Sequence, residues 1–514
     1  MGRRGLLALF LIVLFAPFAL RALLGLETHR ASGSDRALRL ELRIITPHTQ
    51  DIQRTFDRAF SDWHEKSFGE PVRVVYLTPR GTSDMVRYLR DVAGQHGFDN
   101  PDATPSYLGV DVVFGGGDTT FQREILNLLA PLKLPPGLLS SVFPAPDLNG
   151  VPLYERAKGG AAPRWVGVVL ASFGIAYNPE LYEALGLPTP RTWSDLTRPE
   201  LADLVALADP TRSGSAAVAY MMVLQRAMAD REARFLASEP PGTLESPERS
   251  ARHRAQLAAG YHDGMKLLLR IAANARYFTD SGSRPCDDVG NAEAGSAMAI
   301  DFYARMMAEE LGPRRVSYVA PYAATAITPD PVGVLKGVSG EREQLANRFV
   351  EFLLTPEAQQ LWNLSARASP YVERSLRRLP IRRDVYADRR NWADDVDPFA
   401  DAGGFNLRSE WMGLFRDTRE VWAAAWIDSA SSLKTAYRAA LAVPDAVARE
   451  ALLDELADLP IGMDEVAAHK ARREQLELSR AADSQLVNSQ QRLTWSQRFR
   501  AHYAGVETRA KAIR

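Results

Sequence analysis

The sequence predicts an α/β protein with an all-helical C-terminal part. Short apolar strands alternate with helices from Leu38 onward, a pattern typical of a mainly parallel sheet covered by helices. The length of 514 residues allows two or three domains and a large core. Residues 445–514 are helix-forming and poor in glycine, which indicates helices without strands.

The elements of the first 130 residues are expected in strict alternation. Apolar runs of strand length each precede an amphipathic stretch of helical length. In chain order, these strands and helices are expected at residues 40–46, 51–68, 72–77, 83–93, 110–114 and 119–129.

The most informative stretch of the chain is residues 165–215. Its apolar run meets a small-residue loop that contains Ser172, and Asn178-Pro179 then opens a short helix. Ser213-Gly214-Ser215 comes directly before an apolar helical run at residues 216–228. Such a loop presents free backbone N–H groups and two hydroxyls to an anion. A serine before a helix is also a common N-cap, so both interpretations remain open.

The composition changes after residue 390. Aromatic and aliphatic residues recur at helical spacing over residues 411–441, so this segment is expected to pack against a core. Residues 445–514 become increasingly basic. That basic end is either the solvated face of a packing helix, the interpretation we favour, or a surface for a membrane or a partner.

The N-terminus carries a targeting segment. Arg3 and Arg4 precede an apolar run at residues 5–20, and no small-residue cleavage site follows. Residues 1–26 are therefore a cleaved export signal or an uncleaved anchor in the cytoplasmic membrane, and we favour the anchor. Residues 27–37 are polar and are expected to form a tether.

Several classes of protein are disfavoured by composition and motifs. The formal net charge of −1 predicts no nucleic-acid partner. Cys286 is the only cysteine, so an intrachain disulfide is impossible. The histidines lack zinc-type spacing, and no nucleotide-binding glycine pattern occurs, so neither a metal nor another cofactor is expected.

Seven segments together resemble a known family. They are LELRIITPH (40–48), DVVFGGGD with LNLLAPL (111–132), residues 165–215, NARYFTDSGS (274–283), residues 292–303, DPVGVLKG (330–337) and ANRFVEFLLTPEAQQLW (346–362). Segments of this kind, in this order, resemble the periplasmic solute-binding proteins of ABC importers. The resemblance is to the branch that binds ferric ion, thiamine, phosphonates and polyamines.

The resemblance implies a type II periplasmic-binding-protein fold, in which two discontinuous lobes enclose a central cleft. The first lobe is expected at residues 38–131 plus 325–444, the second at 132–324, and a helical extension at 445–514. Closure of the lobes would couple binding to a change of shape that a transporter reads.

The resemblance also implies where the solute is held. The Ser213-Gly214-Ser215 loop would bind its anionic end. Further contacts would come from the end of the first strand, the glycine loop Gly115-Gly116-Gly117 and a second serine loop, Ser281-Gly282-Ser283. The residues expected to contact the solute are Thr46, His48, Gly116, Asp118, Ser172, Ser213, Gly214, Ser215, Ser281, Ser283, Asp301 and Tyr303. Several of these have an ordinary alternative role, because Asp118 and Asp301 are also placed to cap helices.

The expected type of solute follows from a difference between this chain and the ferric-binding members of the family. Ferric-binding members carry two adjacent tyrosines where this chain has Phe302-Tyr303, so a closed ferric site is not expected. The serine loops suit a phosphonate, phosphate or carboxylate, and Asp301, with Asp118, suits an amine. A small anionic or zwitterionic solute is therefore expected.

The expected function is an exported receptor that delivers this solute to an ABC permease and ATPase complex. The alternative is a membrane-anchored sensor or scaffold with the same fold. Catalysis is not expected. Relatives include a thiamine-cleaving enzyme with a cleft cysteine, but Asp287 and Asp288 would raise the pKa of the Cys286 thiol and no histidine adjoins it.

Overall fold

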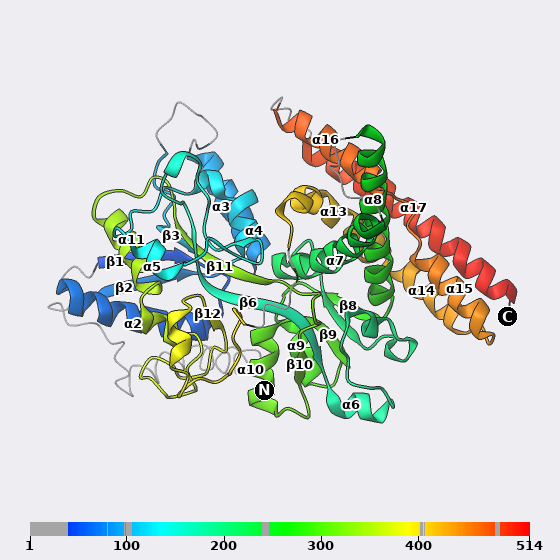
Figure 1. Ribbon diagram of the computed structural model, residues 1–514, viewed down its shortest axis with the longest axis horizontal. Helices are drawn as coiled ribbons and strands as arrows, with labels where there is room; N and C mark the ends of the chain where they lie inside the picture. The colour runs from blue at the N-terminus through cyan, green and yellow to red at the C-terminus, as the bar shows by residue number, and fades with distance from the viewer. Residues whose placement is uncertain are drawn as a thin grey trace, which may run out of the picture.

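The computed structural model describes residues 40–79, 81–96, 98, 105–238, 246–400, 405, 407–478 and 484–513. These residues form two α/β lobes, and a helical C-terminal part packs against the second lobe (Figure 1). The α/β class, the two lobes and the helical C-terminal part are therefore confirmed. The expected targeting segment and tether lie outside the described residues. No described helix has both the length and the apolar character needed to span a membrane.

The strands of the main sheet are β1 (Leu40–Ile45), β2 (Val72–Leu77), β3 (Val112–Phe114), β6 (Val166–Tyr177), β7 (Val205–Ala208), β8 (Ala275–Thr279), β9 (Ser296–Ile300), β10 (Ser317–Val319), β11 (Ile327–Val334) and β12 (Leu379–Pro380). Their order is β2-β1-β3-β11-β6-β9-β7-β8, and β10 and β12 also pair with β6. A small hairpin joins β4 (Asp147–Leu148) and β5 (Val151–Pro152).

Strand β6 connects the two lobes. Its residues are all buried, those up to Leu170 in the core of the first lobe and those from Ala171 in the core of the second. It pairs antiparallel with β11 at its start and with β9 at its end. Strands β6 and β11 thus cross between the lobes, as the long ribbon of β6 shows in Figure 1.

The helices of the first lobe are α2 (Gln50–Phe68), α3 (Thr82–Gln95), α4 (Asp118–Arg123), α5 (Leu138–Val142), α11 (Gly340–Leu353) and α12 (Pro356–Leu361). Their apolar faces enclose a core that includes Phe56, Phe114 and Trp362. The expected helix at 119–129 is split, because α4 ends at Arg123 and a 3-10 turn, η1 (Leu126–Leu128), follows.

The helices of the second lobe are α6 (Pro179–Ala184), α7 (Gly214–Ser238), α8 (Pro247–Ala273), α9 (Arg284–Gly290) and α10 (Asp301–Leu311). Helices α7 and α8 pack closely through two glycines of α8. A Cβ on Gly260 would lie 2.5 Å from the Met228 Cα, and one on Gly264 would lie 2.8 Å from the Leu224 Cα. The absence of side chains there lets the two backbones touch.

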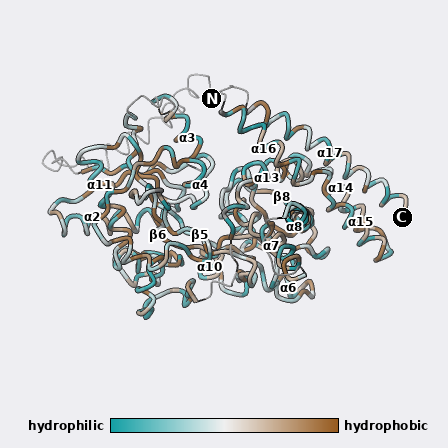
Figure 2. The backbone as a smooth tube through the Cα atoms, turned by 45° about the horizontal axis from the view of Figure 1, so that its top comes forward, coloured by the Kyte–Doolittle hydropathy of each residue, from teal (hydrophilic) through white to brown (hydrophobic). Residues whose placement is uncertain are grey.

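The C-terminal helices are α13 (Phe415–Trp422), the π-helical turn η7 (Ala423–Ile427), α14 (Ala430–Leu441), α15 (Ala446–Ala457), α16 (Met463–Leu478) and α17 (Ser484–Ile513). Along α16 and α17, hydrophobic and hydrophilic residues alternate from turn to turn (Figure 2). Trp495 and Tyr503 of α17 are fully buried, whereas Leu486, Leu493 and Ile513 of the same helix are exposed. Remaining short 3-10 turns are η2 (Lys158–Gly160), η3 (Trp193–Thr197), η4 (Pro199–Leu201), η5 (Asp384–Ala387) and η6 (Ser409–Leu414).

The core clusters correct two expected lobe boundaries. Residues from Phe405 through the C-terminal helices pack in the same cluster as α7 and α8, so the assignment of 405–444 to the first lobe does not hold. The segment between Leu132 and Leu170 packs mainly in the cluster of the first lobe, not the second. Helical spacing predicted that these faces are buried, but it does not specify the element that covers them.

Candidate functional site

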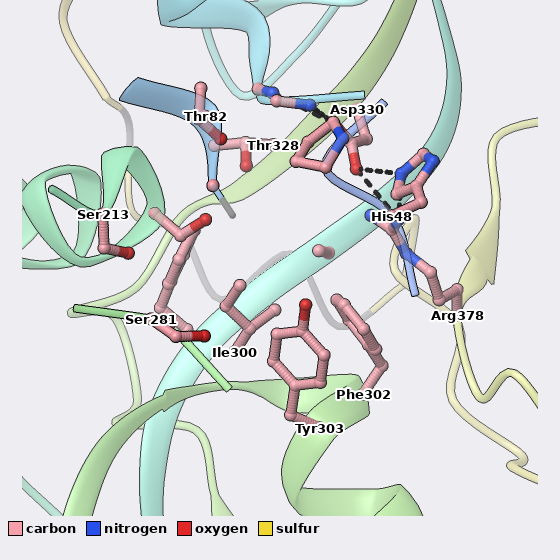
Figure 3. A pocket seen from close by; sticks show the side chains of 18 of the residues that line it. His48, Thr82, Ser213, Ser281, Ile300, Phe302, Tyr303, Thr328, Asp330 and Arg378 are labelled. Carbon is pink, nitrogen blue, oxygen red and sulfur yellow. Dashed lines mark hydrogen bonds and ion pairs between the residues drawn. The ribbon is translucent and has the colours of Figure 1, made fainter. Parts of the chain in front are cut away.

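A cavity of about 110 Å³ lies between the lobes at the crossing strands (Figure 3). The first lobe contributes the loops after β1 and β3, the start of α3 and part of β11. The second lobe contributes the start of α7, the serine loop at 281–283 and the start of α10. Loops at strand ends are the usual ligand sites of open α/β sheets.

The amino ends of α3 and α7 meet across this cavity. A Cβ on Gly214 would lie 3.5 Å from the Thr82 Cγ2, and a Cβ on Gly81 would lie 3.7 Å from the Arg212 carbonyl oxygen. Figure 3 shows Thr82 above Ser213, with His48 and Arg378 on the other side of the view. Each helix end carries a partial positive charge, so the two lobes together create a positive potential in the cavity.

The first turn of α7 leaves two amides without a partner. Ser213 caps the helix, since its Oγ accepts a hydrogen bond from the Ala216 N–H at 3.2 Å. Its carbonyl accepts from the Ala217 N–H at 3.1 Å. The N–H groups of Gly214 and Ser215 make no hydrogen bond to any described residue. The cap and the anion site therefore use different groups of one turn.

Hydroxyl groups surround the same space. Those of Thr82, Ser215, Tyr303 and Thr328 line the cavity and have no hydrogen-bond partner within the described ranges. Burial raises the pKa of Tyr303 to about 12, so its phenol remains a hydrogen-bond donor at neutral pH.

The second serine loop is internally bonded. The Ser281 Oγ lies 3.0 Å from the Ser283 Oγ and accepts a hydrogen bond from the Ser283 N–H at 3.3 Å. Ser281 lines the cavity, and Ser283 orients it from behind. A Cβ on Gly282 would lie 3.0 Å from the Ser213 Oγ, so the two serine loops are in contact.

A buried ion pair forms the floor of the cavity. The Asp330 Oδ1 accepts hydrogen bonds from the Gly116 N–H at 2.7 Å and the Gly117 N–H at 3.0 Å. Its Oδ2 lies 2.9 Å from both the Arg378 Nη1 and the His48 Nε2. The amides of the glycine loop, which we expected to face a solute, thus hold an internal carboxylate.

The charge of this cluster follows from its contacts. Burial alone would raise the pKa of the Asp330 carboxyl, but Arg378, His48 and the Gly117 amide hold it well below its ordinary value. Burial lowers the pKa of His48, so its ring is neutral. The positive charge of Arg378 is consequently compensated within the protein.

The loop after β1 holds the backbone of His48 in place. The Thr46 Oγ1 accepts the His48 N–H at 3.1 Å, and the Gln53 Nε2 donates to the His48 carbonyl at 2.7 Å. A Cβ on Gly115 would come within 2.5 Å of the imidazole ring. The ring therefore rests directly on the backbone of the glycine loop.

Ser172 and Asp301 lie behind the cavity wall. The Ser172 Oγ donates to the Asp301 Oδ2 at 3.1 Å, and the Phe302 N–H donates to the Asp301 Oδ1 at 2.8 Å. Burial raises the pKa of Asp301, while the neighbouring Arg305 lowers it. Asp301 thus binds an amide in the first turn of α10, and the cavity lining omits it.

Half of the expected site residues line the cavity. These are His48, Gly116, Ser213, Ser215, Ser281 and Tyr303. The others lie beside or behind its wall: Thr46, Asp118, Ser172, Gly214, Ser283 and Asp301. Of these, Gly214 contributes the unpaired amide described above.

Several polar lining residues were missed from the sequence, among them Thr82, Arg212, Asp280, Thr328, Asp330 and Arg378. Asp330 begins one of the segments that carry the family resemblance, and Arg212 directly precedes the Ser213 loop. The sequence could therefore have indicated both as site residues. Arg378 is 330 residues from His48 in sequence, and no pattern in the sequence links the two.

The described part of the chain shows no group of three or more His, Cys, Asp or Glu residues placed to hold a metal ion. Cys286 is buried outside the cavity lining. Burial, with Asp287 and Asp288, raises the pKa of its thiol well above the ordinary value.

Comparisons with known proteins show which proteins this chain is similar to. The family model described as "Bacterial extracellular solute-binding protein" matches residues 146–385. An uncharacterized protein of Haemophilus influenzae is 22% identical over 299 residues, which cover 58% of this chain and 70% of the relative.

Solved structures of binding proteins are also similar. The periplasmic binding protein AfuA from Actinobacillus pleuropneumoniae, with exogenous fructose-6-phosphate bound, is 21% identical, with 62% of this chain and 81% of that chain covered and a TM-score of 0.45. The periplasmic binding protein P5PA is 15% identical, with 73% and 97% covered and a TM-score of 0.49. Iron-bound HitA from Pseudomonas aeruginosa is 18% identical, with 74% and 99% covered and a TM-score of 0.46. Residues 146–385 of this chain are thus similar to the bacterial extracellular solute-binding proteins.

Proposed function

We propose that this protein captures a small solute with a phosphate or phosphonate group in the cavity and delivers it to an ABC permease. One observation carries the proposal: the amino ends of α3 and α7 converge from the two lobes on a space bordered by N–H and hydroxyl groups that have no partner among the described residues. Oxyanions are bound by donors of this kind at helix amino ends.

The distribution of charge supports an anion bound mainly by neutral donors. Arg378 is neutralised by Asp330 at 2.9 Å. Arg212 lies at the rim with a side chain 66% exposed, 3.9 Å from Asp209. The ligand charge would then be stabilised by helix ends and hydroxyls, while Arg212 attracts it to the opening.

An amine on the solute would have a different partner from the one expected. Asp301 is turned to Ser172 and the α10 amide, whereas Asp280 lines the cavity beside Ser281. We therefore propose that a zwitterionic solute, such as an aminophosphonate, places its amine near Asp280.

Calorimetric titration tests the proposal. Inorganic phosphate, a sugar phosphate and 2-aminoethylphosphonate are titrated separately, with spermidine and ferric citrate for comparison. The Ser213 oxygen accepts the Ala216 N–H, and its proton, which has no acceptor among the described residues, can be donated to an anion. The Ser213→Ala variant should therefore lose affinity for the bound anion by about tenfold or more, because a hydrogen bond to a charged group contributes roughly 1.5–3 kcal/mol.

The matched control is Ser246→Ala. Ser246 caps α8 with the same geometry, its Oγ accepting the Arg249 N–H at 3.1 Å, but it lies outside the cavity lining. It should lower stability by about 1 kcal/mol, as any lost cap does, and leave affinity unchanged. Equal affinities for the two variants, or tight binding of spermidine or ferric citrate alone, would contradict the proposal.

We further propose that the receptor acts at the outer face of the cytoplasmic membrane, held there by residues 1–26. Delivery to the permease predicts that deleting the gene abolishes uptake of the radiolabelled solute. Unchanged uptake with an altered cellular response to the solute would favour the sensor alternative.

A further inference from the structure

Arg419, on α13, touches the backbone that leads into the Ser213 loop. Its Nε donates to the Pro210 carbonyl at 2.8 Å, and its Nη2 donates to the Thr211 carbonyl at 3.0 Å. The side chain is only 14% exposed. One guanidinium thus fixes two successive carbonyls just ahead of the first turn of α7.

The same guanidinium reaches the first lobe. Its Nη2 lies 3.5 Å from the Ser83 Oγ, and its Nη1 lies 3.7 Å from the Glu124 Oε1. Ser83 follows Thr82 at the start of α3 and itself donates to the Thr211 carbonyl at 3.3 Å. Arg419 therefore joins the C-terminal helices, the Ser213 loop and the first lobe at one point.

Helix α13 is fixed to the second lobe. Val421 and Trp422 are fully buried in the cluster shared with α7 and α8. Asp417, 1% exposed, forms a bidentate ion pair with Arg473 of α16 at 2.9 and 3.0 Å. Any rotation of the second lobe against the first would carry α13 with it.

Open space surrounds the contact between α13 and the first lobe. A second cavity of about 550 Å³ separates α3 and α4 from α13 and α16, and Arg419 lies on its wall. In Figure 1, α13 faces α3 and α4 across the gap between the lobes. Because few packed side chains cross there, the contacts of Arg419 can break without disrupting a core.

We infer that Arg419 is a positioning residue and latch: it holds the Pro210–Ser213 backbone in binding geometry, and its contacts with Ser83 and Glu124 hold the lobes closed. The inference rests on the proposed function, because the loop it positions is the proposed anion loop. When the lobes open, the contacts with Ser83 and Glu124 break, while those with the two carbonyls remain.

The test measures the distance between the lobes without solute. Spin labels are attached at Arg73→Cys in the first lobe and Val447→Cys in the C-terminal part, whose side chains are exposed, while the buried Cys286 remains. Electron–electron double resonance then gives the distribution of distances. Arg419→Gln should shift this distribution towards the open state and lower solute affinity about tenfold.

Two further variants separate the roles. Glu124→Gln leaves the carbonyl contacts intact, so it should open the lobes in part even if Arg419→Gln folds poorly. Arg416→Gln is the matched control, because Arg416 lies on the same helix but pairs with Glu477 of the C-terminal part at 2.9 Å. It should change neither distances nor affinity by more than about twofold.

The outcomes distinguish this inference from the proposed function. An Arg419→Gln distribution identical to that of Arg416→Gln overturns the latch, even if affinity falls. A shifted distribution in a protein that binds none of the tested anions supports the latch and overturns the proposed solute.

Discussion

Asp118 carries a carboxyl group whose ionisation is unfavourable in the folded chain. It is 7% exposed at the first position of α4. Burial raises its pKa to about 6, against the opposing effect of hydrogen bonds from the α4 amides, and the charge of Asp330 raises it further. A carboxylate at a helix start is normally stabilising, so burial here outweighs the helix dipole.

Asp118→Asn should therefore stabilise the protein at high pH. Because the folded-state pKa lies above the unfolded value near 4, stability contributed by this group falls as the pH rises from about 4 through 6. At pH 8 the free energy of unfolding of the variant should exceed that of the unchanged protein by about 1–3 kcal/mol, and at pH 4 the two should be nearly equal. Urea unfolding at both pH values measures this, and an equal difference at both would contradict the ionisation argument.

The loop between β3 and α4 shows how neighbouring elements determine local backbone. Gly115, Gly116 and Gly117 have φ angles of 84°, 112° and 83°. Strand β11 pairs with β3 and brings Asp330 to the loop amides, while the imidazole of His48 covers Gly115. Neighbouring side chains leave no room for a Cβ at Gly115 and Gly116, whereas Gly117 is favoured by its positive φ alone.

A pair of alanine variants separates backbone strain from steric contact. Gly109 has φ 80° and open space at its Cβ position. Gly109→Ala should therefore lower the free energy of unfolding by about 1–2 kcal/mol through backbone strain alone. Gly115→Ala adds a clash at 2.5 Å with the buried His48 ring and should cost about 1–3 kcal/mol more. Chemical unfolding of both proteins compares them, and equal losses would show that the His48 ring moves aside freely.

Over the whole molecule, local patterns were predicted better than long-range contacts. The expected strands at 40–46 and 72–77 and the helix at 51–68 match β1, β2 and α2 to within one residue, because alternation and apolar spacing are local. The pairing of Asp330 with Arg378 and His48 joins distant segments through the fold, and no spacing rule specifies it. For the same reason, the apolar stripe of 411–441 predicted burial but not the lobe that it covers.

The shared core predicts that the second lobe depends on the C-terminal helices. Tyr220 and Leu224 of α7 are 1% exposed and belong to the cluster that contains Trp422, Trp495 and Tyr503, whereas the first lobe has a core of its own. Removal of residues from 405 onward would expose this apolar face of α7 and α8 to water, at roughly 25 cal/mol per Å².

Hydrogen exchange of the shortened protein should therefore show lost protection in β7–β9, α7 and α8, while β1–β3 and α2 remain protected. The intact chain, in which both cores are complete, is the reference. Equal protection of both lobes after the deletion would mean that α7 and α8 are stable without their cover, and that the C-terminal helices are an appendage rather than part of the second lobe.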